Sequence, residues 1–280
     1  MRELNVNEII RAVERLCMEA NYFLPEEITG ALRAGYEKEV SETGKDILLQ
    51  ILQNEEIARN EHSPLCQDTG TTCVFVTIGQ EVHLVGGGLR EAVDEGVRRG
   101  YQKGYLRQSI VGDPLLRKNT GDNTPAMLHV DLVEGEEFQV TVLPKGGGCE
   151  NMSALKMLRP SDGRQGVINF VVDRVFNAGG NPCPPLVLGV GIGGNFDMVA
   201  AIAKKALLRG VGKRNPAPHL AELEEEIRDL CNRTGVGPMG LGGVTTVLDV
   251  NIEAYPTHIA SLPVAMCVNC HSSRYKSAVL

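Results

Sequence analysis

The stretch that decides the fold class is Met127-Leu128-His129-Val130-Asp131-Leu132-Val133, the acidic turn Glu134-Gly135-Glu136, and Phe138-Gln139-Val140-Thr141-Val142-Leu143. Its apolar and polar residues alternate with the period of two that is typical of half-buried strands. The same pattern occurs in Cys73–Ile78 and in Glu81–Val85, which a Gly-Gln pair separates. We therefore expect antiparallel hairpins in the middle of the chain.

Helical patterns lie on both sides of these strands. Apolar residues recur at helical spacing through the first sixty residues or so, where Pro25 opens a second helix and Gly44 separates a third. Further helices are expected at Leu89–Lys103, Gly166–Phe176, Asp197–Leu208 and Ala221–Cys231, and strands at Leu186–Val190 and Val244–Val250.

These patterns predict an α+β fold. A helical N-terminal part is followed by mixed, largely antiparallel sheets with packed helices, in one lobe or two. The chain has neither a Ser- or Pro-rich linker nor a repeat of 20–50 residues, which excludes solenoids and propellers. We therefore predict a single domain over residues 1–280.

Composition excludes other classes of protein. Of the 280 residues, 42% are hydrophobic and 22% are charged, close to average globular usage, which argues against disorder. Lys and Arg number 28 against 35 Asp and Glu, a net charge of −7. A nucleic-acid-binding protein needs a basic surface, so this balance argues against such a partner.

The sequence shows no export or membrane signal. Its start lacks an apolar core, and no apolar run approaches the roughly 20 residues that span a bilayer. We therefore expect a cytoplasmic protein. In that compartment the eight cysteines would not form a disulfide framework. A cysteine in a loop is then a candidate for metal binding or catalysis.

Two motifs fit familiar patterns without the context that each needs. Gly189–Gly194 fits G-x-G-x-x-G, but neither an acidic residue nor a second parallel strand follows at the required place. We favour tight packing of a strand on a helix and keep a nicotinamide site as an alternative. Cys267–His271 fits the C-x-x-C-H haem-attachment spacing, but no export signal accompanies it and no second pair completes a zinc site.

A glycine run, Lys145-Gly146-Gly147-Gly148, lies ahead of a predicted helix. Successive glycines let backbone N–H groups converge on an anion, and the lysine adds positive charge. The run lacks the spacing of a phosphate-binding P-loop. A plain flexible loop is the alternative interpretation.

The cysteines divide by context. Cys17, Cys73 and Cys231 lie in periodic segments and are interpreted as structural, which leaves five in loops or near prolines: Cys66, Cys149, Cys183, Cys267 and Cys270. Prolines on both sides restrict the backbone at Cys183. Cys66 is followed by an amide, a carboxylate and a hydroxyl, a combination suited to metal-centred chemistry on an oxygen-bearing substrate.

These segments occur in one order in a known family: Cys66-Gln67-Asp68-Thr69-Gly70-Thr71, the glycine run, Cys183-Pro184-Pro185, and the segment from His258 through Cys270 to Arg274. The chain resembles the α subunit, or N-terminal half, of class I iron–sulfur fumarate hydratase and its relative L-tartrate dehydratase. The resemblance extends from about the first helix to the last residue.

The resemblance implies a 4Fe–4S cluster held by Cys66, Cys183 and Cys270. Its fourth iron would have no protein ligand, as in catalytic rather than electron-transfer metal sites. The resemblance also implies that Asp68 is an acid–base or water-orienting group and that His258 contacts the substrate. The substrate-binding residues it implies are Gln67, Arg107, Gly146, Gly147 and Gly148. It leaves open whether Arg274 serves the cluster or a helix end.

The implied activity is reversible hydration of fumarate to malate, with L-tartrate dehydration as the alternative; Thr71 favours fumarate. Single-chain relatives continue into a second domain, so the resemblance implies a β-subunit partner, an α2β2 assembly and negligible turnover by this chain alone. A non-enzymatic electron-transfer protein stays a further alternative. It would need Cys149 or Cys267 as a fourth cluster ligand.

Overall fold

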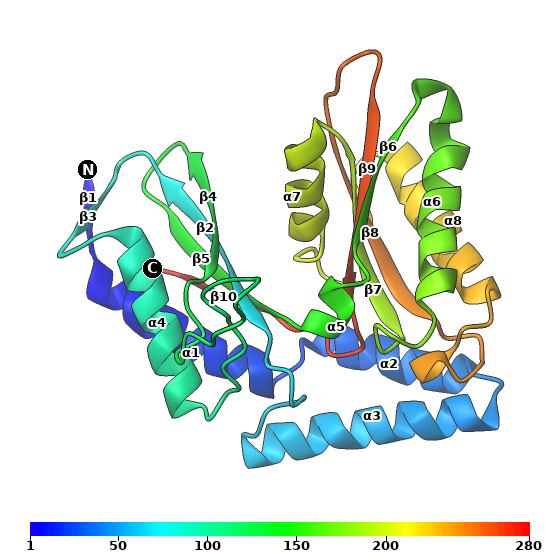
Figure 1. Ribbon diagram of the computed structural model, residues 1–280, viewed down its shortest axis with the longest axis horizontal. Coiled ribbons are helices and arrows are strands. Elements are labelled where there is room, and N and C mark those ends of the chain that lie inside the picture. Colours follow the sequence, from blue (N-terminus) through cyan, green and yellow to red (C-terminus); the bar gives the residue numbers. More distant parts are fainter. The chain divides into compact units, whose positions relative to one another are not determined.

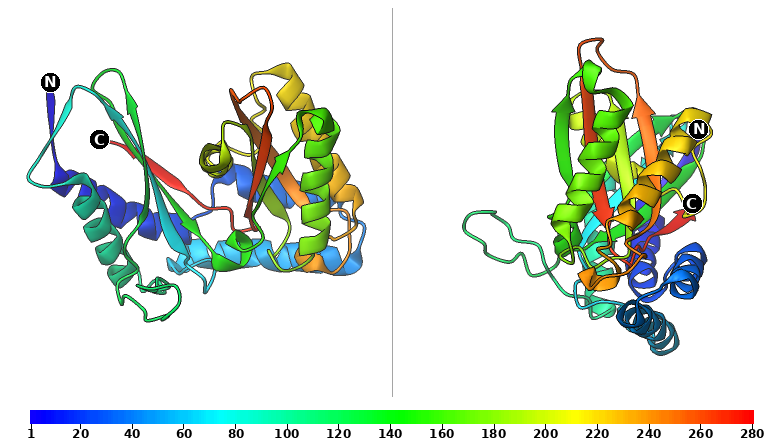
Figure 2. Two further views of the ribbon diagram at one scale, coloured as in Figure 1. Left: turned by 45° about the horizontal axis from the view of Figure 1, so that its top comes forward. Right: turned by 90° about the vertical axis from the view of Figure 1, so that its right-hand side faces the viewer.

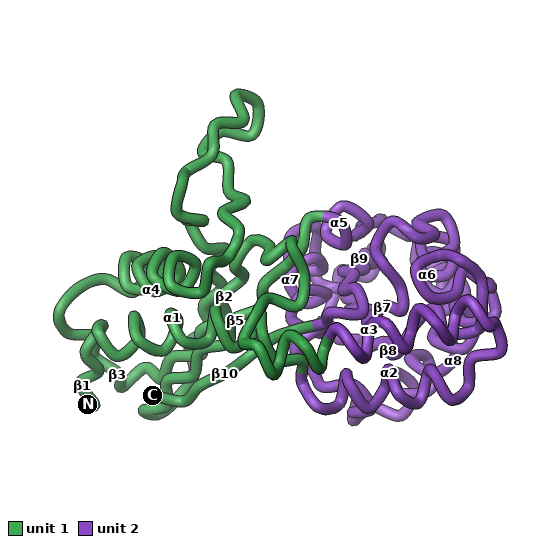
Figure 3. The backbone as a smooth tube through the Cα atoms, turned by 90° about the horizontal axis from the view of Figure 1, so that it is seen from below, with its two compact units in different colours: residues 1–24, 55–147, 274–280 green, residues 25–54, 148–273 purple.

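The computed structural model describes all 280 residues, which form two compact units. Unit 1 comprises residues 1–24, 55–147 and 274–280, and unit 2 comprises residues 25–54 and 148–273 (Figure 3). Each unit is therefore assembled from segments that are separated in the sequence. Whether both units act as one domain over 1–280 stays a prediction.

Unit 1 is built around a four-stranded sheet of order β10-β5-β2-β4 (Figure 1). Its core joins this sheet to α1 and α4, with residues such as Val13, Val74 and Val97 fully buried. A separate parallel pair joins β1 and β3, and a long loop between α4 and β4 extends away from the unit (Figure 3). The element bounds are β1 Arg2–Asn5, α1 Val6–Tyr22, β2 Thr71–Gly79, β3 Val82–Val85, α4 Leu89–Lys103, β4 Met127–Val133, β5 Phe138–Lys145 and β10 Lys276–Val279.

Unit 2 has a second four-stranded sheet, of order β6-β9-β7-β8, with α7 on one face and α6 and α8 on the other (Figures 1 and 2). Leu188 and Val190 of its central strand β7 belong to the same buried cluster as residues of α6 and α8. The bounds are α2 Glu26–Lys38, β6 Ala154–Leu158, α6 Gly163–Ala178, β7 Leu186–Gly193, α7 Phe196–Ala206, α8 Pro218–Arg233, β8 Val247–Tyr255 and β9 Leu262–Asn269. Helix α3, Glu42–Glu61, continues from unit 2 into unit 1. The short α5, Gly147–Glu150, lies where the chain passes from unit 1 back into unit 2.

The glycine-rich motif is the place where α7 packs against β7. A Cβ atom at Gly189 would lie 2.2 Å from the carbonyl oxygen of Ala203, and one at Gly191 would lie 2.3 Å from that of Val199. Only glycine permits this approach, because any larger residue would push the helix off the sheet. The structure thus confirms tight strand–helix packing at this motif.

The α+β prediction is confirmed, whereas the predicted hairpins are wrong. Strand β2 does not pair with β3, which instead pairs in parallel with β1. Strands β4 and β5 do not pair with each other; both pair with β2, β4 in parallel and β5 antiparallel. Four of the seven strand pairs are antiparallel. Period-two alternation shows which residues point to the core, but it does not show which strands are neighbours.

Some element boundaries also differ. Gly44 lies within α3 rather than ahead of it, and the sequence patterns missed β6 and β9. Most of β9 is buried, so its sequence lacks a polar face that would mark it as a strand.

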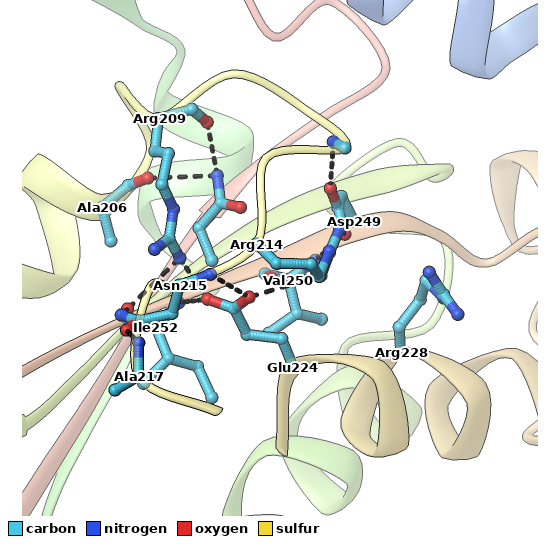
Figure 4. Close-up of polar contacts among 12 residues, drawn as sticks. Ala206, Arg209, Arg214, Asn215, Ala217, Glu224, Arg228, Asp249, Val250 and Ile252 are labelled. Atoms are coloured by element: carbon cyan, nitrogen blue, oxygen red, sulfur yellow. Dashed lines mark hydrogen bonds and ion pairs between the residues drawn. The ribbon is translucent and has the colours of Figure 1, made fainter. Parts of the chain in front are cut away.

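A buried charge network fixes the loop between α7 and α8 to strand β8 (Figure 4). Its centre is Glu224 of α8, which has no exposed surface. The carboxylate pairs with the guanidinium groups of Arg209 and Arg214. It also accepts the backbone amides of Asn215 at 3.0 Å and Ile252 at 2.8 Å. A buried carboxylate is tolerated only when it is paired and hydrogen-bonded in this way.

We predict that Glu224→Gln destabilises the chain by about 3–5 kcal/mol, because the neutral amide removes the buried charge that Arg209 and Arg214 share and leaves each arginine with one carboxylate partner. The matched control is Glu222→Gln, on the exposed side of the same helix, with an expected change within about 0.5 kcal/mol. Urea denaturation followed by circular dichroism measures both. Equal effects of the two substitutions would contradict the prediction.

Candidate active site

The residues singled out in unit 1 gather at one edge of its sheet. Strand β5 is antiparallel to both β2 and β10, so the start of β2, the end of β5 and the start of β10 lie at the same edge. The segment Cys66–Gly70 leads into β2, the glycine run follows β5, and Arg274 precedes β10. Sheet topology thus brings together three segments that are far apart in the sequence.

Asp68 joins these segments. Its Oδ1 accepts the amide of Gly70 at 2.9 Å, and its Oδ2 accepts the amide of Gly147 at 2.8 Å. The guanidinium of Arg274 donates to the Asp68 carbonyl oxygen. The Asp68 amide in turn donates to the Cys66 thiol sulfur at 3.4 Å. The carboxylate therefore has one fixed orientation, next to the cysteine that was predicted as a metal ligand.

Tyr101 and Asn123, two buried residues that the sequence did not indicate, form hydrogen bonds with the backbone that follows Asp68. The Tyr101 hydroxyl donates to the carbonyl oxygens of Thr69 at 2.7 Å and Gly70 at 3.1 Å. Asn123 Nδ2 donates to the same Gly70 carbonyl at 3.2 Å. Burial raises the pKa of Tyr101, so its phenol keeps the proton that it donates. In the sequence, Tyr101 is simply an apolar position of an amphipathic helix.

The predicted substrate-binding side chains of this unit are exposed. Gln67 lies between Cys66 and Asp68, and Arg107 begins the long loop after α4. The backbone at Arg107 is fixed, because its carbonyl oxygen accepts the Thr69 hydroxyl at 3.1 Å. Gln67 thus precedes Asp68 with an exposed side chain, and the exposed Arg107 side chain extends from a backbone that is hydrogen-bonded to Thr69.

Unit 2 brings its two predicted cysteine ligands together. Cys183 precedes β7 and Cys270 follows β9, and these strands are antiparallel with Val187 opposite Asn269. Both thiols are therefore at one end of the sheet. The His271 amide donates to the Cys183 carbonyl oxygen at 3.3 Å, and Cys183 has a positive φ of 55°. That left-handed conformation is uncommon for a residue other than glycine and is a feature of functional loops.

His258 lies elsewhere in unit 2. It is exposed in the loop between β8 and β9, where its Nδ1 accepts the Ala260 amide at 3.1 Å. The eight residues of β9 separate this loop from Cys270, a length of roughly 26 Å. The structure therefore does not bring His258 together with Cys183 and Cys270 of the same chain.

The exposure of the cysteines separates them into two groups. Cys66, Cys183 and Cys270 are the three that are partly exposed, and the other five are buried. Burial raises the pKa of the Cys231 thiol to about 12 and raises that of Cys17 further, so these thiols stay protonated. Cys149 and Cys267 are among the buried five.

This donor set fits an iron–sulfur cluster in its chemistry. Clusters are held by accessible thiolates, and N–H groups directed at the sulfur stabilise them, as the Asp68 amide does for Cys66. No three His, Cys, Asp or Glu side chains gather in the structure as a metal-binding group. Cys66 belongs to unit 1, whereas Cys183 and Cys270 belong to unit 2.

Comparison with known proteins adds the family. A family model described as fumarate hydratase (Fumerase) matches residues 10–279. A Methanocaldococcus jannaschii protein with the provisional name L(+)-tartrate dehydratase subunit alpha is 44% identical over 274 residues, 95% of each chain. L(+)-tartrate dehydratase subunit alpha of Escherichia coli K12 is 32% identical over 272 residues, 96% of this chain and 89% of that one.

The family model and the names of these relatives support a hydro-lyase. The chain belongs to the fumarate hydratase (Fumerase) family, which confirms the resemblance in its sequence. No helix combines the length and the apolar character that crossing a membrane would require.

We predict that three of the eight thiols react with a thiol reagent in the native, metal-free chain, and that the rest react only after denaturation. The reason is that reaction needs an accessible thiolate, which burial denies to the other five. Mass spectrometry after brief alkylation identifies the sites. Fast labelling of Cys149 or Cys267 would contradict the prediction.

Proposed function

We propose that this chain is the α subunit of a hydro-lyase that acts on a small four-carbon dicarboxylate with a 4Fe–4S cluster. The observation that carries the proposal is the coincidence of two independent selections. The family resemblance selects three cysteines as ligands, and the fold leaves those same three partly exposed while it buries five others.

The proposed cluster ligands are Cys66, Cys183 and Cys270. When bound, a cluster with one iron free of protein ligands would supply a Lewis acid for a hydroxyl and a carboxylate of the substrate. Cys149 and Cys267 stay outside the proposed ligand set because both are buried.

Asp68 is the proposed acid–base group. Its carboxylate is oriented by the amides of Gly70 and Gly147 and lies two residues from Cys66. Such orientation is the first requirement for moving a proton to or from a bound water or substrate hydroxyl. Because the Gly147 amide already serves Asp68, we propose that Gly147 positions this carboxylate.

The substrate carboxylate would be bound by Arg107 and Gln67, with Gly146 and Gly148 nearby in the sequence of the glycine run. A guanidinium suits this role because its fork can donate to both oxygens of a carboxylate. The exposure of both side chains in unit 1 leaves them free to close on a ligand.

A role for His258 requires a second copy of the chain. The length of β9 separates it from Cys270, so it cannot contact a substrate bound at the cysteines of its own unit 2. We propose that His258 serves the site of another α subunit, which agrees with an α2β2 assembly. The proposed β partner rests on the names of the relatives, which are alpha subunits.

The names of these relatives favour L-tartrate over fumarate as substrate. The fumarate preference drawn from Thr71 loses support, because the Thr71 hydroxyl donates to the Lys145 carbonyl at 3.4 Å within the sheet. Fumarate stays the second candidate, since the family model is described as fumarate hydratase.

We predict about four iron and four sulfide ions per chain after anaerobic reconstitution. Each of Cys66→Ser, Cys183→Ser and Cys270→Ser should lose most of this iron, and the matched controls Cys149→Ser and Cys267→Ser should retain it. Iron and sulfide assays with visible absorbance measure the content. Loss of the cluster in either control would instead support a fully ligated electron-transfer centre.

We also predict that the chain alone turns over neither L-tartrate nor malate, and that adding its β subunit restores activity with L-tartrate preferred. Initial rates of oxaloacetate or fumarate formation distinguish the two substrates. Full activity of the isolated chain would refute the need for a partner, and a strong preference for malate would reverse the order of substrates.

A further inference from the structure

Arg274 is buried as a cation without a counter-ion. Only 3% of its surface is exposed. One of its nitrogens, Nη2, donates to the Asp68 carbonyl oxygen, whereas Nε and Nη1 have no hydrogen-bond partner. An arginine cannot lose its proton in a protein, so the charge stays at this position.

Arg209, the other arginine with buried nitrogens that lack a hydrogen bond, differs in this respect. Arg209 also has two nitrogens without a hydrogen bond, but its charge is paired with Glu224 and, at 3.4 Å, with Glu253. Burying an unpaired charge is strongly unfavourable even after relaxation. A position that keeps such a charge and two free donors is arranged to receive an anion.

Neither Tyr101 nor Asp68, the two titratable groups that interact with Arg274, supplies that anion. Tyr101, the buried phenol of this edge, keeps its proton because burial raises its pKa. The Asp68 carboxylate is occupied by the amides of Gly70 and Gly147, and Asp68 offers Arg274 only its carbonyl oxygen. The anion must therefore come from outside this group of residues.

We propose that Arg274 is a positioning residue that fixes the backbone of Asp68 through Nη2 and binds an anion through Nε and Nη1. The identity of the anion rests on the proposed function. The anion would lie on the Cys66 side of the loop that contains Asp68. It is either the thiolate-held cluster or a carboxylate of the substrate. The experiment separates these two sources.

The test compares Arg274→Met, which removes the charge, with Arg274→Lys, which keeps a charge but loses the planar fork. The matched controls are Arg98→Met and Arg98→Lys in α4 of the same unit, where Arg98 is ion-paired with Glu95 and Asp122. Iron per chain is measured for every variant, and kcat and KM are measured with the β subunit present.

If the cluster is the anion, Arg274→Met loses most of its iron and Arg274→Lys retains more than Arg274→Met. If the substrate carboxylate is the anion, iron is unchanged and KM rises about tenfold or more in both variants, with a smaller change in kcat. If the Arg274 variants match the Arg98 variants in iron, KM and kcat, the proposal is overturned. Should Arg274→Met not fold, the comparison of Arg274→Lys with Arg98→Lys decides by the same criteria.

A second arm keeps this inference separate from the proposed function. If the wild-type chain binds no iron and shows no turnover with its partner, the proposed function fails. Malonate is then titrated into the iron-free chain, with sodium chloride at matched ionic strength as the control. A rise in melting temperature with malonate that Arg274→Lys weakens supports an anion site, and the absence of any rise overturns it.

Discussion

The Asp68 carboxylate is held between two backbone amides, and the segments at this end of the unit 1 sheet meet at that interaction. One amide comes from its own loop and the other from the glycine run after β5. The Asp68 carbonyl meanwhile accepts Arg274, just ahead of β10. A single residue thus connects three segments whose only common property is that they adjoin neighbouring strands.

In unit 2 as well, the direction of neighbouring strands determines which loops lie at the same end of the sheet. Cys183 and Cys270 flank two antiparallel strands at the end where β7 begins and β9 ends. His258 precedes β9 and therefore lies at the opposite end of this strand from Cys270. In both units, the order and direction of the strands decide which loop residues can act together. Whether two loop residues can share a site therefore depends on how their neighbouring strands pair and on the directions in which these strands run.

Sequence patterns identified the elements better than their partners. Helix α4 matches its predicted range of Leu89–Lys103, because charges and apolar residues mark both its faces. The predicted pairing of β4 with β5 is wrong because alternation is a property of one strand. Which strands become neighbours depends on the helices and loops between them.

The candidate site shows the same limit. Loop context alone left five cysteines as candidates, and burial then set Cys149 and Cys267 apart from the three ligands that the family resemblance implies. The supporting roles of Tyr101 and Asn123 had no signal in the sequence. A tyrosine at an apolar helix position looks like any core residue until the fold shows which carbonyl groups its hydroxyl reaches.

The interleaved segments of the two units also have a consequence for the order of folding during synthesis. Residues 148–273 of unit 2 are made before residues 274–280, which belong to unit 1. Chains fold as they emerge, N-terminal parts first. The side of β5 that pairs with β10 therefore stays unpaired until all of unit 2 has left the ribosome. Only then can β10 add to the sheet and Arg274 reach Asp68, so this part of the site would be among the last to form.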